Sequence, residues 1–139
     1  MNRDRLSHLA PKAILFDCDG TLLLTSEVHF KAIAAAIARQ GSSMPHNWYT
    51  ARTGLARGEL FAHFAADFAV NLDLPGLVRD SITLTVALSA HARENPLVAS
   101  VARQAAGCLP IAVVTNSEAA IARAFLTDTS LLDIFEFIV

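Results

Sequence analysis

The feature of this sequence that most constrains its fold is a short apolar run that ends in two acidic residues and a glycine. Residues 13–17 read AILFD, and Asp19, Gly20 and Thr21 follow within four positions. A short apolar run that stops at a turn signal is typical of a strand buried in a parallel sheet. Both carboxylates, Asp17 and Asp19, can face one site if the backbone turns at Gly20, because glycine adopts conformations that other residues resist. The pattern predicts an α/β fold with a polar site at the carboxyl end of a strand.

Composition narrows the class of protein. The chain has 139 residues, of which 53% are hydrophobic and 17% are charged. This apolar content excludes a disordered chain, and the length corresponds to one domain or slightly more. The net charge of −2 provides no basic excess for binding nucleic acid. The longest apolar stretch near a helix, Ala32–Ala38, has seven residues, whereas a membrane span needs about 20.

The two cysteines, Cys18 and Cys108, stand far apart in the sequence. They form neither a disulfide framework nor a metal-binding CxxC pair. We therefore expect a reducing, cytoplasmic setting.

Periodicity and turn signals predict a strand, a block of helices, and then alternating helices and strands. The expected strands are 13–17, 110–114 and 135–139, and the expected helices are 26–40, 57–70, 75–93, 97–106 and 117–126. The outer elements are typical of a Rossmann-like parallel sheet, and the inner helices read as an insertion above the first strand. We expect a partial α/β core formed by residues 1–24 and 96–139, with an α-helical cap formed by residues 25–95.

The motifs resemble those of the haloacid dehalogenase superfamily. Asp17–Leu22 (DCDGTL) is similar to motif I, and the apolar strand 111–114 followed by Thr115-Asn116-Ser117 is similar to motif II. The insertion resembles the helical cap of the sugar-phosphatase and β-phosphoglucomutase group. Within it, Glu27–Phe30 matches the first cap helix and Thr53–Arg57 matches the cap loop that reaches the active site. The resemblance covers residues 12–139.

The resemblance implies roles for the residues that match. Asp17 would attack phosphorus and Asp19 would act as general acid and base. The Asp17 carboxylate and the Asp19 carbonyl would bind Mg²⁺. Thr115, Asn116 and backbone groups near Gly20 would hold the phosphoryl group. The dehalogenase branch lacks the second acid, so Asp19 favours phosphoryl transfer over carbon–halogen cleavage.

Two residues in the expected cap have two interpretations each. Arg57 either binds a second phosphate or carboxylate of the substrate, or is a solvated charge at the start of a helix. His29 is either a hinge residue close to the site or a structural histidine on a helix face.

The chain departs from the family pattern in two catalytic parts. The family uses a lysine and an acidic pair beyond motif II, but the two lysines here, Lys12 and Lys31, both precede motif II. Residues 131–139 match the family segment just before that lysine, so the sequence looks cut and the sheet is expected to be incomplete. Strand 13–17 would then lie at the edge of the sheet with unpaired backbone groups. A further difference is Leu24, which stands where many relatives carry Asp.

These observations predict a Mg²⁺-dependent phosphatase that hydrolyses a small phosphorylated metabolite, such as a sugar phosphate, through an aspartyl-phosphate. One alternative is a phosphomutase similar to β-phosphoglucomutase, because Arg57 and His29 suit an enzyme that holds a second phosphate. Another is a non-catalytic, truncated fragment or binding module that keeps the phosphate site alone. The expected partner is a small phosphorylated substrate, without nucleic acid or membrane. The oligomeric state stays open.

Overall fold

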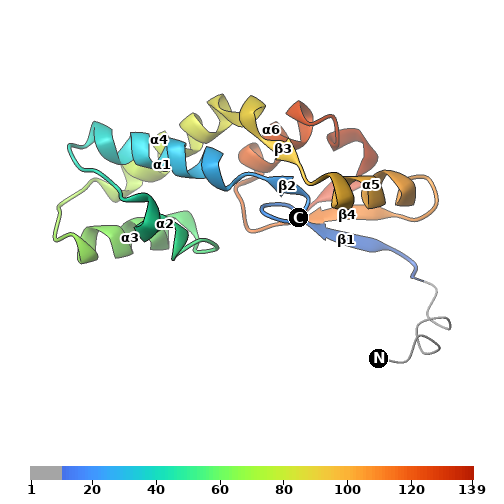
Figure 1. Ribbon diagram of the computed structural model, residues 1–139, viewed down its shortest axis with the longest axis horizontal. Coiled ribbons are helices and arrows are strands. Elements are labelled where there is room, and N and C mark those ends of the chain that lie inside the picture. Colours follow the sequence, from blue (N-terminus) through green and yellow to red (C-terminus); the bar gives the residue numbers. More distant parts are fainter. Residues whose placement is uncertain (1–10) are drawn as a thin grey trace.

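The computed structural model describes residues 11–139, so residues 1–10 of the expected core segment lie outside the described residues. The molecule is elongated, with the strands towards one end and a group of helices at the other (Figure 1). The strands are β1 (Ile14–Asp17), β2 (Leu23–Leu24), β3 (Arg93–Glu94), β4 (Ile111–Val114) and β5 (Phe137–Ile138). The α-helices are α1 (Ser26–Arg39), α2 (His46–Thr50), α3 (Arg57–Asp67), α4 (Leu74–Ala87), α5 (Pro96–Ala105) and α6 (Ala119–Asp128). Two 3₁₀ turns, η2 (Ser89–His91) and η3 (Leu132–Ile134), complete the elements.

The main sheet has three parallel strands in the order β1-β4-β5. The central strand β4 is the most apolar, and its residues Ile111, Ala112 and Val113 are all buried. Strand β1 lies at one edge, as the sequence predicts, and pairs with β4 from Ile14 opposite Ile111 to Asp17 opposite Val114. The parallel α/β architecture is therefore confirmed.

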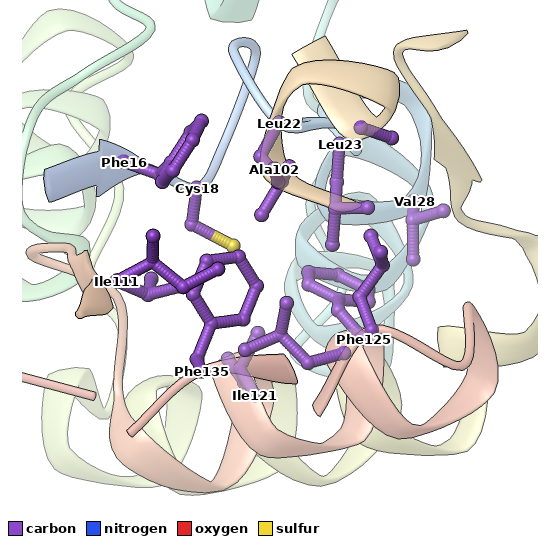
Figure 2. Close-up of a cluster of buried hydrophobic side chains, with 14 residues drawn as sticks. Phe16, Cys18, Leu22, Leu23, Val28, Ala102, Ile111, Ile121, Phe125 and Phe135 are labelled. Atoms are coloured by element: carbon purple, nitrogen blue, oxygen red, sulfur yellow. The ribbon is translucent and has the colours of Figure 1, made fainter. Parts of the chain in front are cut away.

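Helices α5 and α6 bury one face of this sheet. Phe16 of β1 and Val113 of β4 share that face and pack with Ala102 of α5 and Phe125 of α6. Figure 2 shows the Cys18 side chain directed into the same cluster, and Cys18 is fully buried. The strand end therefore contributes to the core as well as to the site described below.

A second apolar cluster lies among α1, α2, α3 and α4. Phe61 and Phe64 of α3 are fully buried there and belong to an apolar stripe at helical spacing. Phe68 of the same stripe lies beyond the end of α3 and is exposed. The two clusters support the proposed division into core and cap. Helix α4 joins them, because its Ile82 and Val86 pack against the core cluster.

The prediction of one helix over 75–93 was wrong at its carboxyl end. Helix α4 ends at Ala87, and the chain then forms η2 and β3. Strand β3 pairs antiparallel with β2, with Arg93 opposite Leu24 and Glu94 opposite Leu23. This pairing joins segments about 70 positions apart in the sequence, a contact that helical periodicity does not reveal.

One further element and one helix start differ from the predicted pattern. The short helix α2, which was not among the expected helices, begins at His46 directly after Pro45. Helix α6 begins at Ala119 and not at Ser117, and the Ser117 hydroxyl donates a hydrogen bond to Asp19 instead of capping the helix. Among residues 11–139, no helix has both the length and the apolar character to cross a membrane.

Candidate active site

The carboxyl end of β1 directs alternate side chains into the core and into solvent. Cys18 is buried, Asp17 is exposed and Asp19 is half-buried. Gly20 has a φ of 77°, in the left-handed region that glycine adopts without strain. Its N–H donates to the Leu23 carbonyl at 2.8 Å, which folds the loop back on itself. The predicted turn at Gly20 is thus present, and in this arrangement its N–H is already used within the loop.

A pocket of about 490 Å³ opens between this loop and the helical cap. Most of the predicted site residues line it, namely Asp17, Asp19, Gly20, His29, Arg57 and Asn116. The cap loop that matches the family's active-site loop, residues 53–57, also lines it. The fold therefore brings these predicted segments to one pocket.

Asp19 accepts three short hydrogen bonds from side chains in two parts of the chain, the start of α1 and motif II. The donors are the Thr25 hydroxyl at 2.7 Å, His29 Nε2 at 2.8 Å and the Ser117 hydroxyl at 2.6 Å. Burial acts to raise the pKa of Asp19, but the hydrogen bonds from His29, Ser117 and Thr25 outweigh it and lower the pKa to about 2. At neutral pH this carboxyl group is ionised and acts as a hydrogen-bond acceptor only.

Asp17 is held less tightly. One of its carboxylate oxygens accepts a hydrogen bond from the Thr21 hydroxyl at 2.6 Å. Its other oxygen takes part in no hydrogen bond among residues 11–139, and the side chain is exposed to the pocket. An oriented carboxylate with a free oxygen suits a nucleophile.

The motif II residues lie beside these acids. The Thr115 hydroxyl is 3.5 Å from Asp19 Oδ2, at the outer limit of a hydrogen bond, and it accepts the Ser117 N–H at 3.1 Å. Thr115 contacts Asp19 without lining the pocket. Asn116 lines the pocket, and its side-chain amide forms no hydrogen bond within the described residues. An amide in this position is available to a ligand.

Arg57 is not a solvated charge, so that interpretation of it was wrong. Its side chain is only 7% exposed, and its Nε donates to Glu118 Oε1 at 3.0 Å. Arg57 Nη2 also lies 3.4 Å from His29 Nδ1. Since arginine can only donate, His29 accepts at Nδ1 and carries its proton at Nε2, the atom that donates to Asp19. His29 thus connects Arg57 to Asp19.

Comparison with known proteins decides the family. The model of the haloacid dehalogenase-like hydrolases matches residues 11–139. The chain belongs to this family of hydrolases. No curated protein matches the chain.

Solved structures of haloacid dehalogenase-like hydrolases share the fold. CbbY from Rhodobacter sphaeroides, in complex with phosphate, is 25% identical with a TM-score of 0.80, and the match covers 93% of this chain and 63% of CbbY. A candidate phosphoglycolate phosphatase from Lactobacillus plantarum is 12% identical (TM-score 0.79; 94% and 62% covered). A candidate β-phosphoglucomutase from Thermotoga maritima is 18% identical (TM-score 0.68; 93% and 61% covered). The chain therefore spans between 61% and 63% of the length of these three structures.

The pocket carries oxygen donors of the kind that Mg²⁺ prefers. Within residues 11–139 no group of three or more His, Cys, Asp or Glu side chains is placed to hold a metal ion. Both Asp19 carboxylate oxygens already accept hydrogen bonds, whereas the Asp19 carbonyl accepts none among the described residues. The Asp17 carboxylate and the Asp19 carbonyl are hard oxygen donors, and Mg²⁺ is commonly held by one or two carboxylates together with substrate phosphate and water. The Asp17 carboxylate and the Asp19 carbonyl therefore suit part of a Mg²⁺ site.

Sequence reasoning missed Thr25, Ser117 and Glu118. Thr25 and Ser117 stand next to predicted helix starts, where a hydroxyl residue is expected to cap the helix. Their hydroxyls bond to Asp19 instead, at sequence separations of six and 98 residues. Ser117 lies within motif II, and that position is the one sequence signal for its role. Glu118 gives no local signal, because its partner Arg57 is 61 residues away.

Proposed function

We propose that this haloacid dehalogenase-like hydrolase is a phosphatase of small phosphorylated metabolites, with sugar phosphates as the preferred class. The observation that carries this proposal is the pair of acids at the end of β1. Asp17, with a free carboxylate oxygen, and Asp19, ionised and held by three donors, face the same pocket of about 490 Å³. The pocket offers a nucleophile and a base side by side.

In the first step, an Asp17 carboxylate oxygen attacks the phosphorus atom of the monoester. A new oxygen–phosphorus bond forms, the ester oxygen–phosphorus bond breaks, and the departing oxygen takes a proton. We assign the delivery of that proton to Asp19. Its three hydrogen bonds favour the ionised form in the present arrangement, so loss of one of them is required before it carries a proton.

In the second step, water attacks the aspartyl-phosphate. Asp19 in its ionised form accepts a proton from the water, the Asp17 oxygen–phosphorus bond breaks, and inorganic phosphate leaves. The present hydrogen bonds from Thr25, His29 and Ser117 suit this step. We assign the phosphoryl oxygens to Asn116, which lines the pocket, and to Thr115, which lies beside Asp19.

The Asp17 carboxylate and the Asp19 carbonyl would hold Mg²⁺. A bound ion would offset the negative charges of the phosphoryl group and of Asp17. This assignment is supported by their oxygen donors and by YfnB from Bacillus subtilis, a hydrolase of this family whose structure is described as bound to magnesium (14% identical, TM-score 0.71).

A phosphomutase is the second candidate. Arg57 favours it, because a buried guanidinium at the pocket suits a second phosphate group. A mutant form of CbbY has been solved in complex with xylulose-1,5-bisphosphate, a ligand with two phosphates. A phosphate-binding module without turnover is the third candidate, since no lysine lines the pocket among residues 11–139.

Replacement of Asp17 by Asn tests the proposed reaction. In the complete protein we expect Asp17→Asn to abolish release of inorganic phosphate from a panel of sugar phosphates, because an amide does not form the phosphoryl intermediate. Asp19→Asn is expected to lower the rate by about 10²–10⁴-fold. The matched control is Asp133→Asn, since Asp133 is exposed and lies outside the pocket.

The products distinguish the three candidates. Phosphate release supports the phosphatase, and an isomerised sugar phosphate supports the mutase. Phosphate or Mg²⁺ affinity without either product supports the binding module. Unchanged turnover in Asp17→Asn would show that the proposed nucleophile is wrong.

We also propose a reducing, cytoplasmic location for this chain. Both cysteines are free: Cys18 is buried and Cys108 is exposed. Proteins of oxidising compartments use cysteines mainly in disulfides.

A further inference from the structure

One ion pair joins the cap to the core across the mouth of the pocket. Arg57 begins α3 in the cap, and Glu118 immediately precedes α6 in the core. Arg57 Nε donates to Glu118 Oε1 at 3.0 Å, and Arg57 Nη2 lies 3.5 Å from Glu118 Oε2. Arg57 is 7% exposed and Glu118 is 34% exposed. A two-point contact between a buried guanidinium and a carboxylate fixes both groups.

The hydrogen bonds of the Arg57 guanidinium are incomplete. Nε and Nη2 face Glu118, and Nη2 also faces His29. Nη1 is buried and has no hydrogen-bond partner among the described residues. A buried charged donor without an acceptor is unfavourable. The arrangement therefore satisfies the hydrogen bonds of Arg57 only in part.

Glu118 occupies the Nε and Nη2 edge of the Arg57 guanidinium, the edge that an anionic ligand would also use. Nη1 is buried and closed to solvent. An anion in the pocket therefore binds the Nε and Nη2 edge only when Glu118 moves away from it. Glu118 thus competes with the ligand for one cation.

We propose that Glu118 is a specificity-determining residue that occupies Arg57 in the ligand-free protein and must be displaced by a second anionic group of the substrate. The inference rests on the proposed function, in which the ligand carries one phosphoryl group at Asp17. A dianionic phosphate at the far end of the ligand competes well against a single carboxylate, whereas an uncharged end leaves the Arg57–Glu118 contact closed. The protein distinguishes ligands with a second phosphate from ligands without one through competition by Glu118 as well as through attraction to Arg57.

Glu118→Gln tests the competition with ligands that differ in one phosphate. The probes are fructose 1,6-bisphosphate and fructose 6-phosphate, titrated by calorimetry in an Asp17→Asn background so that neither is consumed. We expect Glu118→Gln to raise the affinity ratio of bisphosphate to monophosphate by about tenfold, because a neutral amide competes less well for a guanidinium. The control Glu136→Gln removes the same charge from an exposed position outside the pocket and is expected to leave the ratio unchanged.

Three results in this titration would overturn the proposal. The first is an unchanged or reduced ratio in Glu118→Gln, which would mean that Glu118 only positions Arg57. The second is an equal increase in Glu136→Gln, which would indicate a general charge effect. The third is no binding of the bisphosphate by either Glu118 form, since an uncovered Arg57 in this pocket should accept a dianion.

A measurement without ligand separates this proposal from the proposed function. Hydrogen exchange at the first turn of α3, where the Leu60 N–H donates to the Ala56 carbonyl at 2.9 Å, reports how firmly Arg57 is held. We expect faster exchange there in Glu118→Gln and wild-type exchange in Glu136→Gln. Equal exchange in all three proteins would show that the contact between Arg57 and Glu118 does not hold the first turn of α3 in place. Failure of the proposed function would appear elsewhere, as phosphate release that does not depend on Asp17.

Discussion

At the residue scale, three consecutive side chains at the end of β1 serve different purposes. Asp17 is exposed in the pocket, Cys18 is buried among apolar side chains, and Asp19 is bound by three donors. Alternation along an extended segment produces this arrangement, because neighbouring side chains point to opposite sides. A conservative change at Cys18 would therefore disturb the core and the site together.

The two cysteines should differ strongly in reactivity. Burial, together with the negative charges of Asp19 and Asp17, raises the pKa of the Cys18 thiol to about 12. Since the thiolate is the reactive form, Cys18 should resist alkylation at about pH 8 until the protein unfolds. Cys108 is exposed and should react in the native state. Mass spectrometry after brief treatment with iodoacetamide measures both sites, and Cys108→Ser should then show no native labelling. Equal labelling of the two residues would contradict the buried position of Cys18.

At the element scale, the start of α4 is anchored at two points. The Asp73 side chain accepts the Gly76 N–H at 3.1 Å, as expected of an N-cap residue. Gln40, just after α1, forms two hydrogen bonds with the backbone of Asp73. Its Nε2 donates to the Asp73 carbonyl at 3.1 Å, and its Oε1 accepts the Asp73 N–H at 2.8 Å. Together these bonds connect the end of α1 to the start of α4.

Loss of this cap should lower stability without affecting the pocket. We expect Asp73→Ala to decrease the free energy of unfolding by about 1 kcal/mol, because it leaves a helix N–H without its acceptor. Urea denaturation followed by circular dichroism measures the change. Asp133→Ala is the control, since Asp133 is exposed and its side chain makes no hydrogen bond within residues 11–139. A change below about 0.3 kcal/mol for Asp73→Ala would mean that water replaces the cap.

At the scale of the whole molecule, one face of the sheet is covered and the other is open. Leu15, Ala112 and Phe137 share the open face, because Ala112 pairs with Leu15 on one side and with Phe137 on the other. Leu15 is 63% exposed and Phe137 is 54% exposed, and Val114, two residues beyond Ala112, is 42% exposed. Contiguous apolar surface of this kind promotes association. Among residues 11–139, strand β1 also has no pairing partner on its outer side, which adds an open edge to the same region.

The 139-residue chain should therefore self-associate through this face. We expect light scattering to show oligomers at micromolar concentration, together with binding of a hydrophobic dye. The double variant Leu15→Thr, Phe137→Thr should reduce both, while Leu97→Thr on the exposed side of α5 (80% exposed) should not. A wild-type chain that stays monomeric and binds no dye would refute this prediction.

Local patterns in the sequence were sufficient to predict the parallel sheet and the block of helices, and the resemblance to haloacid dehalogenase motifs indicated the segments that line the pocket. The apolar runs 14–17 and 111–114, and the turn at Gly20, are properties of neighbouring residues, so they can be recognised without a structure. They also placed Asp17 and Asp19 at the end of a strand. Helix ends were predicted less well, because α4 stops where β3 pairs with β2.

Only the tertiary structure decided how the site residues interact. Ser117 bonds to Asp19 across 98 positions, and Glu118 bonds to Arg57 across 61. Nothing local marks these pairs, because a hydroxyl or carboxylate beside a helix start is equally suited to capping or to solvent. The packing of the cap against the core removes water from Arg57 and Asp19, and each buried charge then takes the nearest available partner. The sequence by itself determined which chemical groups reach the pocket. Folding determined the hydrogen bonds between them, because burial turns exposed polar groups into groups that require specific partners.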